Sequence, residues 1–197
     1  MGTNEADTPK TGRWIPTAAV TTAAVLACAA GVWGYHAGRT GAVRVDLPAS
    51  SDPAIQASCT NLIKALPSDV EGGHRRGVVG DDRNVKRRAA AWGYPATILR
   101  CGVTEPPEIT VGGPDYTPLK NRYANMGDSA FVNWLIQEHE HSVTYTTTDR
   151  AAYVEVIVPF DDELQKEAAS NALVDLAPMI VMNIPDKAGK FVDDQPE

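Results

Sequence analysis

The 197-residue sequence lacks the local motifs by which common enzyme classes are recognised. It contains no Gly-x-Ser-x-Gly nucleophile elbow, and its glycine pairs at 72–73 and 112–113 fit neither a phosphate-binding loop nor a dinucleotide-binding fingerprint. It also has no internal repeat of solenoid length. The sequence therefore predicts no catalytic residue, no metal ligand and no cofactor, and it favours a role other than catalysis.

Positive charge is scarce. The chain has 18 Lys and Arg against 25 Asp and Glu, a net charge of −7. Without residues 1–39, 15 basic and 23 acidic residues remain, a net charge of −8. A general nucleic-acid-binding protein needs a net basic face that displaces counterions from phosphates. The sequence therefore predicts no nucleic-acid partner.

Cysteine is scarce too, with three residues in the chain. Cys28 lies in an apolar run, which leaves Cys59 and Cys101 to form one bond. If the soluble part lies outside the cytoplasm, we expect a Cys59–Cys101 disulfide. Its loop of about 40 residues would contribute roughly 3–4 kcal/mol. Two buried free thiols are the alternative, and the wide spacing disfavours a redox-active pair.

The one long apolar run covers residues 14–35, which include no charged residue. As a helix of 22 residues it would span roughly 33 Å, close to the hydrocarbon thickness of a bilayer. Trp14 near one end, and Trp33 and Tyr35 near the other, fit the aromatic belts of a spanning helix. We predict an uncleaved signal anchor. A cleaved signal peptide and a lipoprotein signal with the lipid on Cys28 are the alternatives.

The anchor predicts how the chain is organised. Residues 1–13 form a cytoplasmic N-terminus, 14–35 the transmembrane anchor, 36–49 a tether, 50–184 an extracytoplasmic domain and 185–197 a polar tail. Basic residues flank the run almost equally on both sides, so the orientation rests on the short N-terminus and the cysteine pair. The predicted location is the cell membrane, with a single pass and the C-terminal domain outside.

The pattern of apolar residues predicts an α+β domain. Asp52 or Ser51 caps a helix that begins at Pro53 and ends at Pro67, with Cys59 on its buried face. Asp161 or Asp162 caps a final helix, which Pro178 ends or kinks. Strands are expected at residues 89–92, 96–103, 131–137, 142–148 and 151–158, and residues 72–88 are expected to be irregular.

The last three strands are joined by short turns at 138–141 and 149–150, so they should be antiparallel neighbours. The two amphipathic helices need an apolar surface to cover, and one face of that sheet provides it. The predicted fold is an N-terminal transmembrane helix followed by a two-layer domain, in which two helices cover an antiparallel sheet.

Several segments in this register resemble a known family. They are Leu66-Pro67 after Cys59 and Leu62, Arg87-Arg88, Ala91-Trp92-Gly93, Leu99-Arg100-Cys101-Gly102-Val103, Val132-Asn133-Trp134-Leu135, residues 145–150, and Tyr153-Val154-Glu155-Val156 with Val158-Pro159. Together they resemble the actinobacterial domain-of-unknown-function family DUF3515 over residues 50–180. Thr148-Asp149 departs from the Val-Gly of that pattern. The resemblance implies a membrane-anchored or secreted envelope protein and implies no activity.

The acidic domain contains one basic segment. Residues 72–100 carry seven basic and two acidic residues. Arg75, Arg76, Arg87 and Arg88 could bind anionic lipid headgroups or phosphate-bearing envelope polymers. The alternative is internal pairing with the acidic residues of 151–197. Arg100, Trp92 and Tyr94 could line a small-molecule pocket, or the aromatic rings could pack on the sheet.

His139 and His141 are the remaining candidates for chemistry. On an extended backbone they point the same way and could share a metal, but two ligands do not complete a site, and a solvated turn is favoured. Three functions follow. The first is an interaction module that binds another envelope protein, the second a binding protein for an anionic envelope lipid or polymer, and the third an unrecognised hydrolase.

Overall fold

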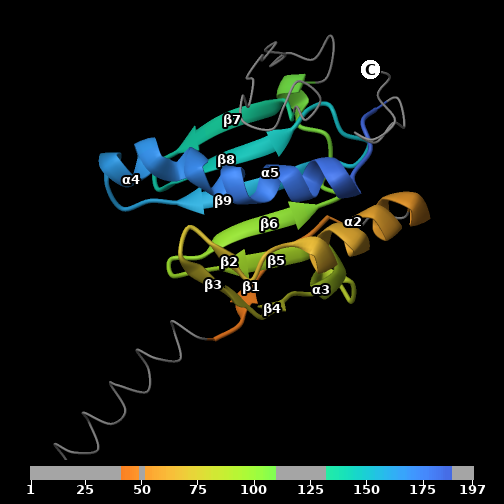
Figure 1. The fold of residues 1–197 in the computed structure, drawn as a ribbon, viewed down its shortest axis with the longest axis horizontal. Coiled ribbons are helices and arrows are strands. Elements are labelled where there is room, and N and C mark those ends of the chain that lie inside the picture. The colour runs from red at the N-terminus through yellow and green to blue at the C-terminus, as the bar shows by residue number, and fades with distance from the viewer. Residues whose placement is uncertain (1–40, 49–51, 110–131, 188–197) are drawn as a thin grey trace, which may run out of the picture. The chain divides into compact units, whose positions relative to one another are not determined.

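The computed structural model describes residues 41–48, 52–109 and 132–187 of the chain (Figure 1). Within these ranges, no helix is both long and apolar enough to cross a membrane. The predicted cytoplasmic segment and anchor, residues 1–35, lie outside the described residues, and so does Cys28. The anchor and its alternatives therefore stay predictions.

A seven-stranded sheet forms the centre of the domain, and every neighbouring pair of its strands is antiparallel. The spatial order is β2-β3-β5-β6-β9-β8-β7. The strands are β2 (Asp69–Val70), β3 (Gly73–Arg76), β5 (Ala89–Trp92), β6 (Thr97–Cys101), β7 (Trp134–His139), β8 (Ser142–Thr147) and β9 (Val154–Pro159). The predicted α+β class with an antiparallel sheet is confirmed.

Strand order departs from sequence order at one place. β6 pairs with β9 rather than with β7, in a register that sets Ile98 opposite Ile157 and Cys101 opposite Val154. After β6 the chain therefore crosses to the far edge, and the hairpins β7–β8 and β8–β9 lead back to β6. The prediction that the last three strands are antiparallel neighbours is confirmed.

The turn predicted at residues 138–141 is shorter in the structure. Glu138 and His139 belong to β7 and pair with Val143 and Ser142 of β8, which leaves Glu140 and His141 as the turn. Polar side chains at the end of an edge strand face solvent, so their polarity does not interrupt pairing.

The first helix follows the prediction. α2 (Pro53–Ala65) begins after Asp52, whose carboxylate accepts hydrogen bonds from the backbone N–H of Ala54 at 2.8 Å and of Ile55 at 3.5 Å. Pro53 occupies the first turn, where its missing N–H costs nothing.

The predicted final helix is divided. It consists of α4 (Glu163–Ala168), the 3-10 turn η2 (Ala169–Asn171) and α5 (Ala172–Asn183), and Asp162 caps α4. Pro178 lies inside α5 and does not end it, contrary to that part of the prediction. Burial of Ile180 and Val181 beyond the proline offsets the lost backbone hydrogen bond.

The segment expected to be irregular is ordered. It holds β3, which pairs with β2 just before the segment, the strand β4 (Val78–Val79) and the short helix α3 (Val85–Arg88). The strand β1 (Val43–Arg44) pairs in parallel with β4, outside the main sheet. These strands have two to four residues, too few for the alternation that identifies a strand in a sequence.

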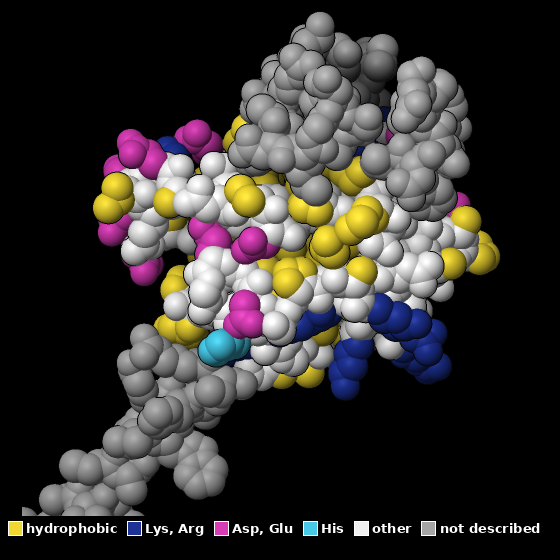
Figure 2. Space-filling model, viewed as in Figure 1, with side chains coloured by type: hydrophobic (Ala, Val, Ile, Leu, Met, Phe, Trp, Pro, Cys, Tyr) yellow, Lys and Arg dark blue, Asp and Glu magenta, His cyan; other side chains and the backbone are white. Residues whose placement is uncertain are grey.

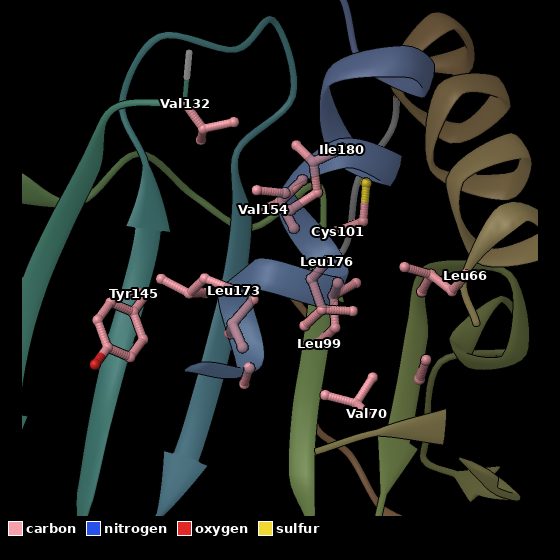
Figure 3. Close-up of a cluster of buried hydrophobic side chains, with 14 of the residues drawn as sticks. Leu66, Val70, Leu99, Cys101, Val132, Tyr145, Val154, Leu173, Leu176 and Ile180 are labelled. Atoms are coloured by element: carbon pink, nitrogen blue, oxygen red, sulfur yellow. The ribbon is translucent and has the colours of Figure 1, made fainter. Parts of the chain in front are cut away.

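The main core lies between one face of the sheet and the helices α2 and α5 (Figures 1 and 3). Leu99, Val154 and Val156 of the sheet and Leu176 and Ile180 of α5 are completely buried in it. A second, smaller cluster covers part of the opposite face and is formed by Val45, Val78, Val85, Ala89 and Ala91. The predicted pair of covering helices is thus present, and β1, β4 and α3 cover the other face near β5.

A disulfide joins Cys59 of α2 to Cys101 of β6, as expected, and both residues are completely buried. The bond fixes α2 to the end of the strand that joins the two halves of the sheet. With a sequence separation of 42 residues, it contributes about 4 kcal/mol in the chain-entropy account.

We expect the double substitution Cys59→Ala and Cys101→Ala to lower the free energy of unfolding by about 3–4 kcal/mol, because the loop is no longer closed in the unfolded chain. Denaturant unfolding of the purified full chain measures the loss. Cys28→Ala is the matched control and should leave stability unchanged. Equal stability of the double variant and wild type would contradict the structural role of the bond.

Candidate interaction surface

Two of the predicted ligand-binding arginines fix the backbone around β3. Arg75 donates to the carbonyls of Ile63 at 2.8 Å and Leu66 at 3.1 Å, at the end of α2, and its guanidinium lies 5.8 Å from the centre of the Trp92 ring. Burial lowers the pKa of Arg75. Arg76 donates to the carbonyls of Gly41 at 2.7 Å and Gly93 at 3.0 Å. Both guanidinium groups join segments that are distant in sequence.

Arg88 is the most buried of the predicted arginines, with 1% of its surface exposed. Its guanidinium donates to the carbonyls of Cys101 at 3.1 Å, Gly102 at 2.7 Å and Pro48 at 2.8 Å. It also forms an ion pair with Asp82 at 3.1 Å. A buried charge with this set of partners stabilises the junction of α3, β6 and the segment before α2.

Trp92 and Arg100 lie on opposite faces of the sheet. Trp92 is 1% exposed, belongs to the main core and donates to the Pro67 carbonyl at 3.0 Å. Arg100 pairs with Glu155 on the neighbouring strand and donates to the Asp46 carbonyl at 2.9 Å. The structure therefore does not bring Trp92 and Arg100 to one pocket. Arg100–Glu155 is a pairing of the basic segment with the acidic C-terminal part, as the internal alternative predicted.

Arg87 has a different environment from its neighbour Arg88. It is exposed and lines a groove of about 320 Å³ between α2 and α3. The other lining residues are mostly small or amide-bearing: Gln56, Ala57, Thr60, Asn61 and Asn84, with Arg88 at the base. Among the predicted arginines, Arg87 is therefore the best placed to bind an anionic ligand, and that prediction rests on it.

A larger groove of about 820 Å³ lies at one end of the sheet. Three segments form it: the β2–β3 hairpin, the β5–β6 turn and the stretch from the end of β9 through α4. Arg75, Arg76 and Trp92 contribute to its lining, and Tyr94, which is 60% exposed, forms part of its wall. The volume lies in the range of binding sites for small molecules or short peptide segments.

Tight backbone contacts shape this groove. Glu71 and Gly72 have positive φ angles of 48° and 74° in the turn between β2 and β3. A Cβ atom on Gly73 would come within 2.8 Å of the Gly93 Cα, so the close approach of the hairpin to the β5–β6 turn requires glycine at position 73. Close backbone contact between the two turns thus shapes this part of the groove.

Two carboxylates lie side by side between the groove and α5. The Glu71 backbone N–H donates to Asp175 of α5 at 3.2 Å. Burial raises the pKa of Glu71, and the charge of Asp175 raises it further. No ion pair to either carboxylate is found among the residues that the structure describes.

The outward face of α5 is apolar beside this pair. Val174 is 56% exposed and Met182 57% exposed, and Pro178 lies between them at a spacing of four residues. Figure 2 shows apolar side chains gathered over α5 and acidic side chains toward α4. The groove, the carboxylate pair and the apolar face of α5 together form a candidate interaction surface.

The histidines predicted as possible metal ligands lie at the β7–β8 hairpin. His139 ends β7, and His141 lies in the turn with 78% of its side chain exposed, 3.7 Å from Glu140. Across the described ranges, no group of three or more His, Cys, Asp and Glu side chains is arranged to hold a metal.

Comparison with models of protein families assigns the sequence to one family. The model of the family "Protein of unknown function (DUF3515)" matches residues 15–189. The chain belongs to this family. The match begins within the predicted anchor and extends across the DUF3515 domain described above. Neither the curated proteins nor the solved structures include a match.

The sequence does not predict the part of this surface that the turns and α5 contribute. Glu71, Gly73 and Gly93 lie in turns, and Asp175 is more than 100 residues from Glu71 along the chain. The nearest signal was the composition of α5, in which Asp175 and Asn183 are the only polar residues. A helix with so few polar residues indicates either complete burial or a covered outer face.

Arg87 and Arg88 provide a matched test of the two environments. We expect Arg88→Ala to lower the free energy of unfolding by about 3–5 kcal/mol, because Asp82 and three carbonyls lose a buried donor. Arg87→Ala should change it by less than about 0.5 kcal/mol. Denaturant unfolding measures both, and Arg88→Lys keeps the charge if the alanine variant does not fold. Similar losses for the two positions would contradict the assignment.

The raised pKa of Glu71 predicts how stability depends on pH. The cost of ionising Glu71 is absent below the carboxyl's unfolded-state pKa and complete above its folded-state pKa. Glu71→Gln should therefore match wild type in acid and be more stable at neutral pH by about 0.5 kcal/mol, since solvent screens an exposed pair. Urea unfolding across pH measures the difference. Glu167→Gln removes an equal charge from α4 and controls for net charge.

Proposed function

We propose that the chain is a membrane-anchored, extracytoplasmic binding domain that holds a segment of another envelope protein. The observation that carries the proposal is the 820 Å³ groove between the β2–β3 hairpin, the β5–β6 turn and α4. Its lining combines apolar surface from Tyr94, Pro95 and Ala168 with polar groups from Glu71, Asp161 and Gln165. Sites that bind peptide segments or small ligands have this mixture.

The groove is built on a fixed scaffold, which supports binding without large rearrangement. Arg75 connects β3 to the end of α2, and Arg76 connects it to the β5–β6 turn. The disulfide fixes α2 in turn to β6. A preformed site loses less conformational entropy when it binds a partner.

The exposed Tyr94 supports a protein as the ligand. Its ring is 60% exposed at the groove wall, with the Arg76 guanidinium 6.0 Å from the ring centre. Tyrosine and arginine are enriched in protein interfaces, where the ring supplies contact area and the hydroxyl a hydrogen bond.

The location is part of the proposal. Disulfides persist in oxidising compartments outside the cytoplasm, and the Cys59–Cys101 bond is consistent with such a compartment. The apolar run at 14–35 supplies a membrane span of suitable length. The family match includes nearly all of that run, which supports its being part of the domain's normal context.

An anionic envelope lipid or polymer is the second candidate ligand. The exposed Arg87 and the amide side chains around the 320 Å³ groove favour it there. Binding at this groove would weaken as salt increases. Unchanged binding of anionic vesicles after Arg87→Glu would remove this candidate.

The proposal predicts a protein that contacts the groove in cells. We would replace Tyr94 with the photocrosslinking residue p-benzoylphenylalanine in the full chain and irradiate living cells. A discrete crosslinked protein is expected at Tyr94, and none at Val79, which is also exposed but lies on β4. A version with an unrelated anchor should give the same product, because the groove belongs to the domain.

Filling the groove makes the test specific. Ala168→Trp places a large ring in the groove lining and should lower the crosslink yield at least about fivefold, a change of roughly 1 kcal/mol. Leu164→Trp is the matched control on the same helix, since Leu164 is exposed and outside the lining. Equal yields in the two variants would overturn the groove as the binding site.

A further inference from the structure

α5 is apolar on the side that faces solvent as well as on the side that faces the core. Leu176 and Ile180 are completely buried against the sheet, whereas Val174 and Met182 are more than half exposed. Surface helices normally place polar residues outward. Over α5 the solvent-facing row is instead Val174, Pro178 and Met182, along about 12 Å of helix.

Acidic residues border this apolar row at its N-terminal end, toward α4 (Figure 2). Residues 161–175 contain five acidic residues and one lysine, a net charge of −4. The lysine, Lys166, is already paired with Glu138 at 2.7 Å. Glu71 adds one more carboxylate beside Asp175, and a cation would relieve the repulsion between these two.

We propose that the outward face of α5 docks an amphipathic helix of a partner protein, with an apolar stripe along one face and Lys or Arg beside it. The inference rests on the proposed function in that the domain binds a protein, but its apolar contacts lie on α5, outside the groove lining, and Glu71 alone of its five residues is shared with the groove. The partner's apolar residues cover Val174, Pro178 and Met182, and its basic residues neutralise Glu71 and Asp175.

A helix suits this surface better than an extended segment. The backbone groups of α5 are hydrogen-bonded within the helix, so α5 offers no edge with which a strand could pair. A partner helix satisfies its own backbone and packs its i, i+4 ridge beside the row at Val174, Pro178 and Met182.

Charge distinguishes the partner from two other occupants. A second copy would bring another domain of net charge −8 against this one, and like charges across an interface oppose association. An anionic lipid surface would be repelled in the same way. A basic helix gains from the same border, and the gain should decrease as salt increases.

The test uses two synthetic model helices of 18 residues as probes. Both carry leucine at the i, i+3, i+4 and i+7 positions of one face; one has lysines beside the stripe and the other has glutamates. The full chain is reconstituted in discs of zwitterionic lipid, and fluorescence anisotropy of the labelled peptide is measured after subtraction of empty discs. The lysine peptide should bind at least about tenfold more tightly than the glutamate peptide, a difference of roughly 1.4 kcal/mol.

Variants assign the binding to α5. The pair Val174→Ser and Met182→Ser should weaken binding of the lysine peptide about tenfold, because two apolar contacts are lost. Val79→Ser, which removes an exposed valine from β4, should not change it. Asp175→Lys should abolish the preference for lysine over glutamate. Ala168→Trp, which fills the groove, should leave peptide binding unchanged, so a failure of the groove and a failure of α5 give different results.

Three results would overturn the inference. Equal binding of the two peptides would show that the acidic border does not select for a basic partner. Unchanged binding in the double serine variant would place the peptide elsewhere. Sedimentation that shows a dimer, lost in the double serine variant, together with no peptide binding, would show that a second copy covers α5.

Discussion

The antiparallel pairing of β6 with β9 joins parts of the chain that are about 50 residues apart. β2, β3 and β5 lie on one side of this pair, and β8 and β7 lie on the other. α5 and α2 cover the same face, and the disulfide attaches α2 to the last residue of β6. The groove depends on this pairing as well, since one wall comes from the β5–β6 turn and another from the end of β9.

Three arginines donate hydrogen bonds to backbone carbonyls that lie outside the strand pairing of the sheet. Arg75 donates to two backbone carbonyls at the end of α2, and Arg76 and Arg88 each donate to carbonyls of two separate segments. A guanidinium has five donors in a rigid plane, so one side chain can satisfy several carbonyls at a junction of loops. The basic segment of this acidic domain is therefore largely an internal framework. Even adjacent residues of the segment, such as Arg87 and Arg88, lie in different environments.

The sequence predicted the elements that have a strong local signal. Asp52 and Pro53 mark the start of α2, and Asp162 marks the start of α4. The β-branched residues of β8 and β9 and the apolar β5 are equally clear. Local signals fail where strands are two residues long, as in β1, β2 and β4, and where tertiary burial extends α5 past Pro178.

The candidate surface was harder to predict for a related reason. Trp92 and Arg100 are eight residues apart, yet strand alternation places them on opposite faces. Arg87 and Arg88 are adjacent, yet one faces solvent and the other is buried. The contact of Glu71 with Asp175 depends on how α5 packs beside the β2–β3 turn, which no local pattern encodes.

The pairing of β6 with β9 also sets an order of events during synthesis. β6 emerges with one edge paired to β5, and the other edge stays open until β9 has been made. At roughly 5–20 residues per second this delay is roughly 3–10 seconds. An open strand edge readily pairs with other chains. Over that interval the nascent chain is most exposed to aggregation, and a chaperone or rapid packing of α2 over β6 would protect it.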